Sequence, residues 1–396
     1  MLADPQTASP RSAARQHTLR ERNLELVARA VFEAPEPLSR ADVATSTGLA
    51  RATVSTLVDR LVAGGLLAEL APVSAQRAGR PAVPLVPASR SVVGIGLEVN
   101  VDYLGASVMD LTGEVVDERV EPGAFHDSDP SVVLPRVGVL ARELAATAAA
   151  EGMRVAGARL ALPGLVDARS GLLRVAPNLG WSSLDPVPLL GLGDLHVGVA
   201  NEAKLAGLAE LTGDVAPSFL YVSADVGIGA AIVVDGQLFL GERGWNGEIG
   251  HVRVDPQGPR CGCGSFGCLE QYAGKEAVNR AAGLPLESPV EALVRALEAR
   301  QPQAEAALHR AGTALGSALA DFVNLVDVGT VVLGGAYTTL LPWMRDDVGG
   351  VLADRVLSAP FSPVELRPAV AGPYAAMAGG AREVLRDVLA SPADWV

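Results

Sequence analysis

The sequence predicts an α/β protein with an N-terminal winged helix-turn-helix over residues 17–88 and a duplicated, two-lobed α/β body over residues 92–390. Three observations predict this architecture. Helical periodicity followed by two short apolar stretches marks the first ninety residues, and a pattern of antiparallel strands followed by a helix occurs twice in the remainder. A chain of 396 residues is also long enough to bury the cores of two or three domains.

Three helices are expected in the N-terminal part. The first helix is predicted by apolar residues that share one face: Leu24, Val27, Ala28, Val31 and Phe32. Pro35 and Pro37 end it. Ser39 and Asp42 have the spacing of a capping box that opens a second, short helix, and this helix stops near Gly48. A third helix is expected over residues 50–63, with four side chains turned inward: Val54, Leu57, Val58 and Leu61. Residues 1–16 are expected to form a disordered tail and residues 391–396 to fray.

The outer face of the third helix carries polar and basic side chains that suit phosphates and base edges: Arg51, Thr53, Ser55, Thr56 and Arg60. Two short strands, Leu66 to Leu70 and Val83 to Val86, are expected to flank a wing that carries Arg77 and Arg80. The negative potential of a minor groove attracts such guanidinium groups. These features indicate DNA binding, and the alternative is a small helical domain for protein contacts.

Charge is distributed unevenly along the chain. The first ninety residues contain eleven Arg, no Lys and eight acidic residues, whereas the whole chain has a net charge of −13. A basic head on an acidic body is typical of a protein that binds a polyanion through the head. No uncharged apolar run reaches the roughly 18 residues of a membrane span, and the N-terminal residues do not resemble a signal peptide. We therefore expect a cytoplasmic protein without membrane contact.

The body is predicted to consist of two similar halves. The first half is expected to contain a helix over residues 131–150 and four strands: Val92 to Val99, Tyr103 to Asp110, Glu114 to Val120 and Val155 to Leu162. The second half is expected to contain a turn at Gly227-Ile228-Gly229 and a long helix from Leu308 to Val326. Its strands are expected at Phe219 to Ala224, Ala230 to Val234 and Thr330 to Leu333. The repetition predicts two lobes with a cleft between them, where small ligands are usually bound.

All three cysteines of the chain, Cys261, Cys263 and Cys268, lie in one glycine-rich loop shortly after His251. Three thiolates and one imidazole complete a tetrahedral zinc shell and leave no position for water, so the expected Zn²⁺ is structural. The intervening glycines allow the tight backbone that such a loop needs. An odd number of cysteines disfavours a disulfide framework, and the alternative is a metal-free or redox-active loop.

The spacing of Glu248 and His251, followed by Cys-Gly-Cys-Gly-x-x-Gly-Cys-x-Glu up to Glu270, resembles the signature of the ROK family of repressors, open reading frames and sugar kinases. Shorter motifs extend the resemblance over most of residues 92–390: Leu162-Pro163-Gly164, Pro177-Asn178-Leu179-Gly180-Trp181 and Val332-Leu333-Gly334-Gly335. The N-terminal winged helix resembles the head of the regulator branch. The resemblance implies an actin-like, sugar-kinase-like body and a transcriptional regulator, expected to be a repressor, that responds to a monosaccharide or sugar derivative.

The resemblance also implies which residues contact the sugar. In the family's kinases an Asn-Asp pair supplies hydrogen bonds and a general base to the sugar hydroxyl, and the matching residues here are Asn201 and Glu202. The remaining sugar contacts fall on four residues: Asn178, Glu248, His251 and Glu270. Asn and Glu suit a sugar because its hydroxyls need both donors and acceptors. His251 is expected to bind zinc through one ring nitrogen and the sugar through the other.

The phosphate-binding turn of the kinases, Asp-x-Gly-Gly-Thr, corresponds here to Gly96-Leu97-Glu98-Val99-Asn100. Side chains at both glycine positions hinder the close approach of backbone to phosphate, and Glu98 adds negative charge. We therefore expect no catalytic residue, with Glu202 at a degenerate base position. Two alternatives stay open: an ATP-dependent sugar kinase with a regulatory head, and a regulator whose body docks a partner protein. In a homodimer or homotetramer, paired heads predict an inverted-repeat operator.

Overall fold

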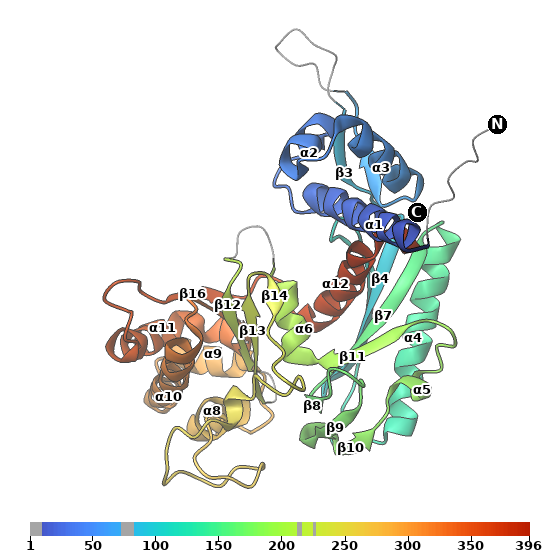
Figure 1. Ribbon diagram of the computed structural model, residues 1–396. Helices are drawn as coiled ribbons and strands as arrows, with labels where there is room; N and C mark the ends of the chain where they lie inside the picture. Colours follow the sequence, from blue (N-terminus) through green and yellow to red (C-terminus); the bar gives the residue numbers. More distant parts are fainter. Residues whose placement is uncertain (1–9, 73–82, 212–215, 225–226) are drawn as a thin grey trace, which may run out of the picture.

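The structure, a computed structural model, describes residues 10–72, 83–211, 216–224 and 227–396. Figure 1 shows a small helical head, in blue, above a lobe that is coloured from cyan to green. A second lobe, coloured from yellow to orange, lies beside the first. The chain returns from the second lobe through a final long helix, in red, which ends near the head.

The head contains three helices and a small sheet. The helices are α1 (Pro10–Phe32), α2 (Arg40–Thr47) and α3 (Arg51–Ala63). The sheet has the order β1-β3-β2, with β1 (Leu38–Ser39), β2 (Leu67–Glu69) and β3 (Pro84–Pro87). The Ser39 hydroxyl accepts from the Asp42 amide and the Asp42 carboxylate accepts from the Ser39 amide, so the capping box is confirmed. Gly48 ends α2 with a φ of 71°.

The two lobes share one sheet topology. The first sheet has the order β11-β7-β4-β5-β6: β4 (Val92–Val99), β5 (Tyr103–Asp110), β6 (Val115–Pro122), β7 (Arg154–Leu162) and β11 (Val197–Asn201). The second has the order β14-β13-β12-β15-β16: β12 (Phe219–Ala224), β13 (Ile228–Val234), β14 (Gln237–Leu238), β15 (Thr330–Gly335) and β16 (Glu365–Pro368). Each is an antiparallel meander of three strands extended by two parallel strands, so the predicted duplication is confirmed.

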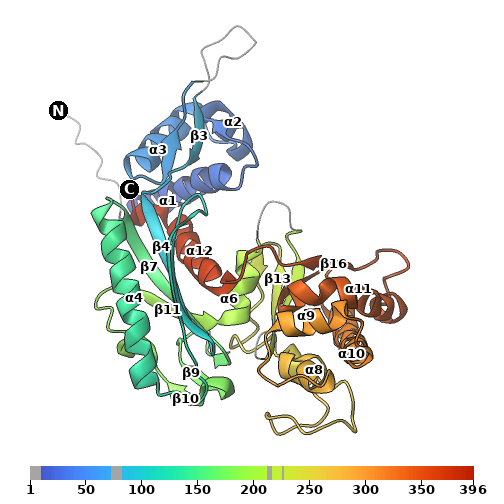
Figure 2. The ribbon, with the colours of Figure 1, turned by 180° about the vertical axis from the view of Figure 1, so that it is seen from behind.

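Helices cover both sheets, as Figure 2 shows from behind. In lobe one, α4 (Pro130–Ala150) packs on β4 and β5, and α5 (Val187–Leu190) packs on α4. In lobe two, α8 (Lys275–Ala281), α9 (Val290–Glu298), α10 (Pro302–Val326) and α11 (Ala336–Arg355) form the outer layer. Among the helices of the described segments, none combines the length and the apolar character that crossing a bilayer requires.

Two expectations about the ends of the chain were wrong. Helix α1 begins at Pro10, so residues 10–16 belong to a helix and not to a disordered tail, and residues 1–9 lie outside the described residues. Residues 391–396 do not fray: they form the short helix η3 (Pro392–Asp394), and Trp395 and Val396 pack against the core of the head.

Two further differences concern the lobes. Ile228 and Gly229 were predicted to lie in a turn, but they pair with Ala224 and Ser223 as the start of β13. A small sheet that was not predicted joins β7 to β11 and consists of β8 (Leu165–Val166), β9 (Leu173–Ala176) and β10 (Trp181–Leu184).

The lobes meet along two helices, α6 (Glu202–Ala209) and α12 (Ala375–Ala390), which pack against each other. Helix α12 also lies across β4, where two glycines leave room for its backbone. A Cβ atom on Gly96 would lie 1.8 Å from the Met377 carbonyl oxygen, and one on Gly94 would lie 2.4 Å from that of Ala381. The glycines of β4 therefore allow the helix that joins the lobes to approach the sheet.

Replacing Gly96 with alanine is expected to lower the free energy of unfolding by about 3 kcal/mol, because the added methyl group must displace the backbone of α12. Chemical denaturation of the full chain measures this change. Gly350→Ala is the matched control, since nothing lies within 4 Å of a Cβ atom there and the residue is inside α11. The control should gain about 0.5–1 kcal/mol from helix propensity. Equal effects of the two substitutions would contradict the packing argument.

Candidate functional site

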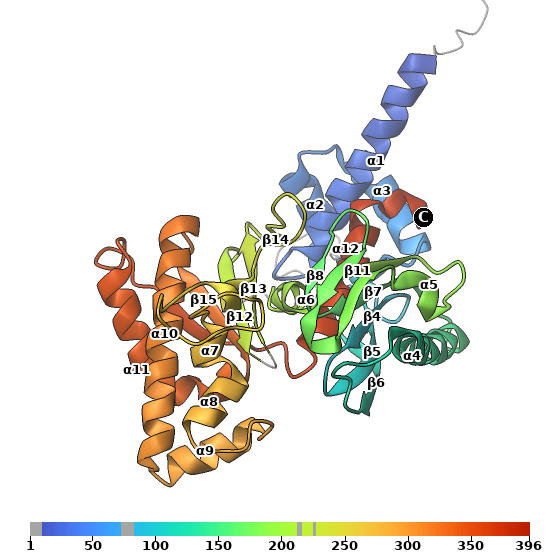
Figure 3. The same cartoon turned by 90° about the horizontal axis from the view of Figure 1, so that it is seen from below.

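A cavity of about 620 Å³ lies between the two lobes. Figure 3 shows the two lobes side by side, seen from below. The volume of the cavity is in the range that is usual for small-ligand sites. The structure brings all six residues that were expected to contact a sugar to the lining of this one cavity: Asn178, Asn201, Glu202, Glu248, His251 and Glu270. They come from four separate segments of the chain, around Asn178, Asn201, Glu248 and Glu270.

Lobe one supplies Asn178, Asn201 and Glu202. Asn201 ends β11 and caps α6 by accepting from the Lys204 amide at 3.2 Å. Its Nδ2 donates to the Gly164 carbonyl and to the Glu202 carboxylate, both at 3.1 Å. Both polar atoms of the Asn201 side-chain amide are therefore hydrogen-bonded, and its bond to Glu202 holds that carboxylate at the N-terminal end of α6.

Lobe two supplies Glu248, His251 and Glu270. Glu248 precedes the short helix η2 (Ile249–His251), and Glu270 begins α7 (Glu270–Ala273). Burial raises the pKa of the Glu248 carboxyl and that of the Glu270 carboxyl. A Cβ atom on Gly227 would lie 2.8 Å from Glu270 Oε2, so glycine there lets the backbone approach the carboxylate.

Lys204 is a component of the site that sequence reasoning missed. Its side chain is 4% exposed, and its ammonium group donates to the Gly244 carbonyl of the loop that leads to Glu248. Burial lowers the pKa of Lys204, while the neighbouring Glu248 and Glu202 carboxylates raise it. A lysine on the apolar helix α6 carries no sequence signal of this role, because only the tertiary structure places Gly244 over it.

The lining of the cavity is acidic. Among the described residues that line it there are three carboxylates, from Glu202, Glu248 and Glu270, and no lysine or arginine. Lys204 lies behind the lining and is bound to a carbonyl. An uncharged ligand with many hydroxyl groups can use these acceptors, whereas an anionic ligand is repelled by them.

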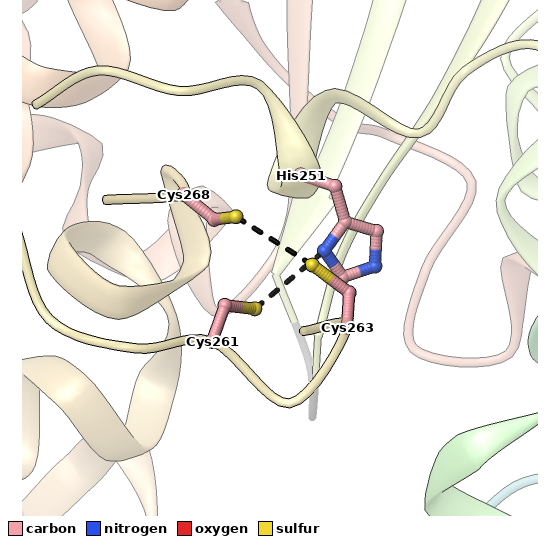
Figure 4. Close-up of side chains that lie close together, drawn as sticks. All are labelled: His251, Cys261, Cys263 and Cys268. Atoms are coloured by element: carbon pink, nitrogen blue, oxygen red, sulfur yellow. Dashed lines mark hydrogen bonds between the residues drawn. The ribbon is translucent and has the colours of Figure 1, made fainter. Parts of the chain in front are cut away.

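Four side chains beside the cavity have the arrangement of a metal centre (Figure 4): His251, Cys261, Cys263 and Cys268. One ligand atom from each lies within 4.8 Å of all the others. His251 Nδ1 is 3.8 Å from Cys261 Sγ, and Cys263 Sγ is 3.7 Å from Cys268 Sγ. A tetrahedron with Zn–S bonds of about 2.3 Å has edges of about 3.8 Å, so the four residues fit zinc.

The position of this cluster connects it with the cavity. It lies between η2, which follows Glu248, and α7, which begins with Glu270. In Figure 4 His251 turns one ring nitrogen toward the sulfur atoms and the other away from them. His251 and Cys263 also line the cavity, so two residues belong both to the cluster and to the cavity wall.

The segment that was expected to match the phosphate-binding turn of the kinases, residues 96–100, lies on β4 and just after it. Glu98 is 2% exposed and pairs with Gly105 and Ala161 inside the sheet. Asn100 donates to the Glu98 carboxylate at 3.3 Å.

The predicted DNA-contacting face of α3 is only partly open. Arg51, Thr53, Thr56 and Arg60 are exposed, and the four inward residues are buried as expected. Ser55 is half-buried, and its hydroxyl and carbonyl oxygens accept from Arg40 at 3.0 Å. Arg77 and Arg80 lie outside the described residues.

The fold and the cavity together define a two-lobed, sugar-kinase-like protein with a helix-turn-helix head. The model of the ROK family matches residues 95–386, and the chain belongs to this family. The model of the IclR helix-turn-helix domain matches residues 28–71.

Three similar proteins illustrate the family. A xylose repressor of Caldicellulosiruptor bescii is 25% identical over 401 residues, which cover 95% of this chain and 98% of that protein. The crystal structure of a ROK family transcriptional regulator, a homologue of the E. coli MLC protein, has a TM-score of 0.79 and 27% identity over 94% of this chain and 97% of that one. The ROK hexokinase from Thermus thermophilus has a TM-score of 0.62 and 28% identity over 76% and 98%.

Proposed function

We propose that this protein is a sugar-responsive transcriptional repressor of the cytoplasm. Its head binds operator DNA, and its interlobe cavity binds a monosaccharide or a sugar derivative. The observation that carries the proposal is the presence, in one chain, of a helix-turn-helix head and of a cavity on which six hydrogen-bonding side chains converge. Similarity along the whole chain to a xylose repressor supports it.

In this proposal α3 is the recognition helix and enters the major groove. Arg51 and Arg60 contact phosphates, and Thr53, Ser55 and Thr56 lie at the base edges. Arg77 and Arg80 of the wing reach the adjacent minor groove. The chain acts as a homodimer or homotetramer on an inverted repeat, because two related heads read two related half-sites.

Zinc has a structural role in the proposal. His251, Cys261, Cys263 and Cys268 would hold it, and four protein ligands leave no open position for a water molecule. The ion would join the segment after Glu248 to the segment before Glu270, so that the two carboxylates keep a fixed separation.

In this proposal the DNA-binding head is the unit over residues 17–88, and the sugar-binding body is the unit over residues 92–390.

We propose no kinase activity. The buried Glu98 carboxylate and the Val99 side chain occupy the glycine positions of the phosphate-binding turn, and Glu202 is one methylene longer than the aspartate base of the kinases. A displacement of about 1 Å in a reacting group costs on the order of 10²-fold in rate. The likeness to a ROK hexokinase keeps an ATP-dependent sugar kinase as the second candidate. Turnover of ATP with the sugar that binds most tightly would establish that candidate instead.

The acidic lining predicts that the ligand is an unphosphorylated sugar. Each negative charge of a phosphate about 7 Å from a carboxylate is opposed by about 2 kcal/mol at an effective dielectric constant near 20. Phosphorylation should therefore weaken binding by about tenfold or more. Calorimetry with glucose against glucose 6-phosphate, and with N-acetylglucosamine against its 6-phosphate, measures the difference. A phosphorylated sugar that binds as tightly as its parent would contradict the electrostatic argument.

The function itself is tested by a mobility shift on the DNA upstream of the gene, with a panel of xylose, glucose and N-acetylglucosamine. The proposal expects a shifted complex whose amount changes with at least one sugar. DNA binding that no sugar alters would leave the regulator without its effector. The remaining alternative is a body that docks a partner protein. A thermal-shift measurement distinguishes it from a sugar-binding body, because a body that binds no sugar gains no stability from any sugar at millimolar concentration.

A further inference from the structure

The head and the body are not joined by a free linker, because they share one hydrophobic core. Leu24 of α1, Leu61 of α3 and Leu66 are each fully buried in a cluster that the body completes. The body contributes residues of β4, of β5 and the turn after it, and of α12: Val92, Met109, Leu111, Ala381, Leu385 and Val388. The orientation of the head is therefore fixed by contacts that can be identified.

The last residues of the chain lie against the end of the proposed recognition helix. Gly64 is the C-cap of α3, with a φ of −77°, so its backbone conformation does not require glycine. A Cβ atom there would lie 2.3 Å from Val396 Cγ1 and 3.0 Å from the Trp395 carbonyl oxygen. The absence of a side chain at Gly64 thus makes room for Trp395 and Val396.

Arg154, the first residue of β7, bonds both to the end of α3 and to the last residues of the chain. Its guanidinium group donates to the Gly64 carbonyl at the end of α3 and, at 3.3 Å, to the Trp395 carbonyl. The same group lies 5.3 Å from the centre of the Trp395 ring. A cation at the C-terminal end of a helix is also favoured by the helix dipole.

Ser91 adds a second bond from the body. Its hydroxyl donates to the Gly65 carbonyl at 2.6 Å, and its own carbonyl accepts from the Arg154 amide at 2.8 Å. Two consecutive carbonyls after α3 are thus bound by lobe one, through Arg154 and Ser91.

Helix α12 leads from the cavity side of the molecule to this contact. It begins after Tyr374, at the connection from β16 of lobe two, and runs between the lobes toward the head (Figures 1 and 2). The fully buried Glu210 of lobe one holds that connection by accepting from the amides of Val370 and Ala371 at 2.9 Å. At its other end α12 continues into η3 and then into Trp395.

We propose that Arg154, Trp395 and Val396 form a clamp that positions the recognition helix relative to α12, so that a change between the lobes reorients the head. This inference rests on the proposed function. A rigid helix that touches both lobes at one end and the head at the other gives a physical route between cavity and DNA. The clamp residues act through α3 and contact neither the sugar nor DNA.

The test uses Trp395→Ala and Arg154→Lys in the full chain. The first removes the ring and leaves the backbone contact, and the second keeps the charge but loses the planar fork that bridges two carbonyls. Trp343→Ala is the matched control, since Trp343 is a half-exposed tryptophan of α11 in lobe two. The probes are the upstream DNA and whichever of xylose, glucose and N-acetylglucosamine gives the largest thermal shift.

Three dissociation constants are measured for each protein: that for the sugar, that for the DNA without sugar, and that for the DNA with saturating sugar. In the wild type and in the control the sugar is expected to change DNA affinity by about tenfold or more. In both clamp variants the affinity for sugar should stay within about twofold, while the change in DNA affinity shrinks to about twofold or less. Hydrogen exchange at residues 64–66 should become faster in the clamp variants alone.

Clamp variants that respond to sugar as the wild type does would overturn the inference and leave the proposed function intact. A wild type that binds DNA but responds to no sugar would overturn both. A clamp variant that loses sugar binding as well would show a general structural role and would also overturn the inference.

Discussion

Replacing Cys263 with serine is expected to remove zinc from the protein and to weaken sugar binding together with it. Cys263 is exposed and lines the interlobe cavity, so the substitution leaves no new void in the core. Structural zinc contributes on the order of 10 kcal/mol of apparent binding free energy in small domains, and the loss of one of four ligands forfeits much of this. Zinc content should fall from about one ion per chain to a small fraction of that.

The reason for the linked loss of sugar affinity is geometric. The cluster joins the segments that carry Glu248 and Glu270, and without the ion the two carboxylates are no longer held together. We expect sugar affinity to fall by about tenfold or more, measured by calorimetry beside zinc analysis by mass spectrometry. Ser265→Ala, in the same loop, is the control, because it removes only a hydroxyl that accepts from Arg253. Full zinc content in the Cys263 variant would refute the ligand assignment.

Replacing Glu248 with glutamine is expected to weaken sugar binding by about 10- to 100-fold. A hydrogen bond to a charged group contributes about 1.5–3 kcal/mol, and the amide offers one acceptor oxygen where the carboxylate offers two. Glu248 lines the cavity and is half-buried, so solvent replaces the lost contact only in part.

Glu242→Gln is the matched control for this variant. Its side chain is 82% exposed, and it lies in the same loop, six residues before Glu248. The same change of charge is then made outside the cavity. If both variants lost affinity equally, the effect would be one of net charge and not of a contact in the cavity. An unchanged affinity in the Glu248 variant would remove this residue from the site.

Much of the fold could be predicted because its strands are strongly patterned. The apolar runs of β4, β5 and β12 were placed with the bounds that the structure has. The start of β13 was missed because two glycines flank Ile228 and suggested a turn, whereas pairing with β12 decides their conformation. The sheet of β8 to β10 was missed because each of its strands has only two to four residues.

The candidate site was predictable as a set of residues and not as a geometry. The resemblance to the ROK family implied the six cavity residues, and the spacing of the cysteines and the histidine indicated the four cluster residues. The structure brings each set together. Lys204 and the clamp at Arg154 and Trp395 were missed, because their partners are distant in sequence. Contacts such as those between Arg154 and Gly64 exist only once the lobes, α12 and the head have assembled.

The central claim is that one ligand in the cavity and DNA on the head affect each other's binding. The most direct measurement is a closed thermodynamic cycle on the full chain: DNA affinity with and without saturating sugar, and sugar affinity with and without saturating DNA. Because coupling is reciprocal, the two ratios must agree, and we predict a common factor of about tenfold or more. A common factor of one, with both ligands bound, would contradict the account.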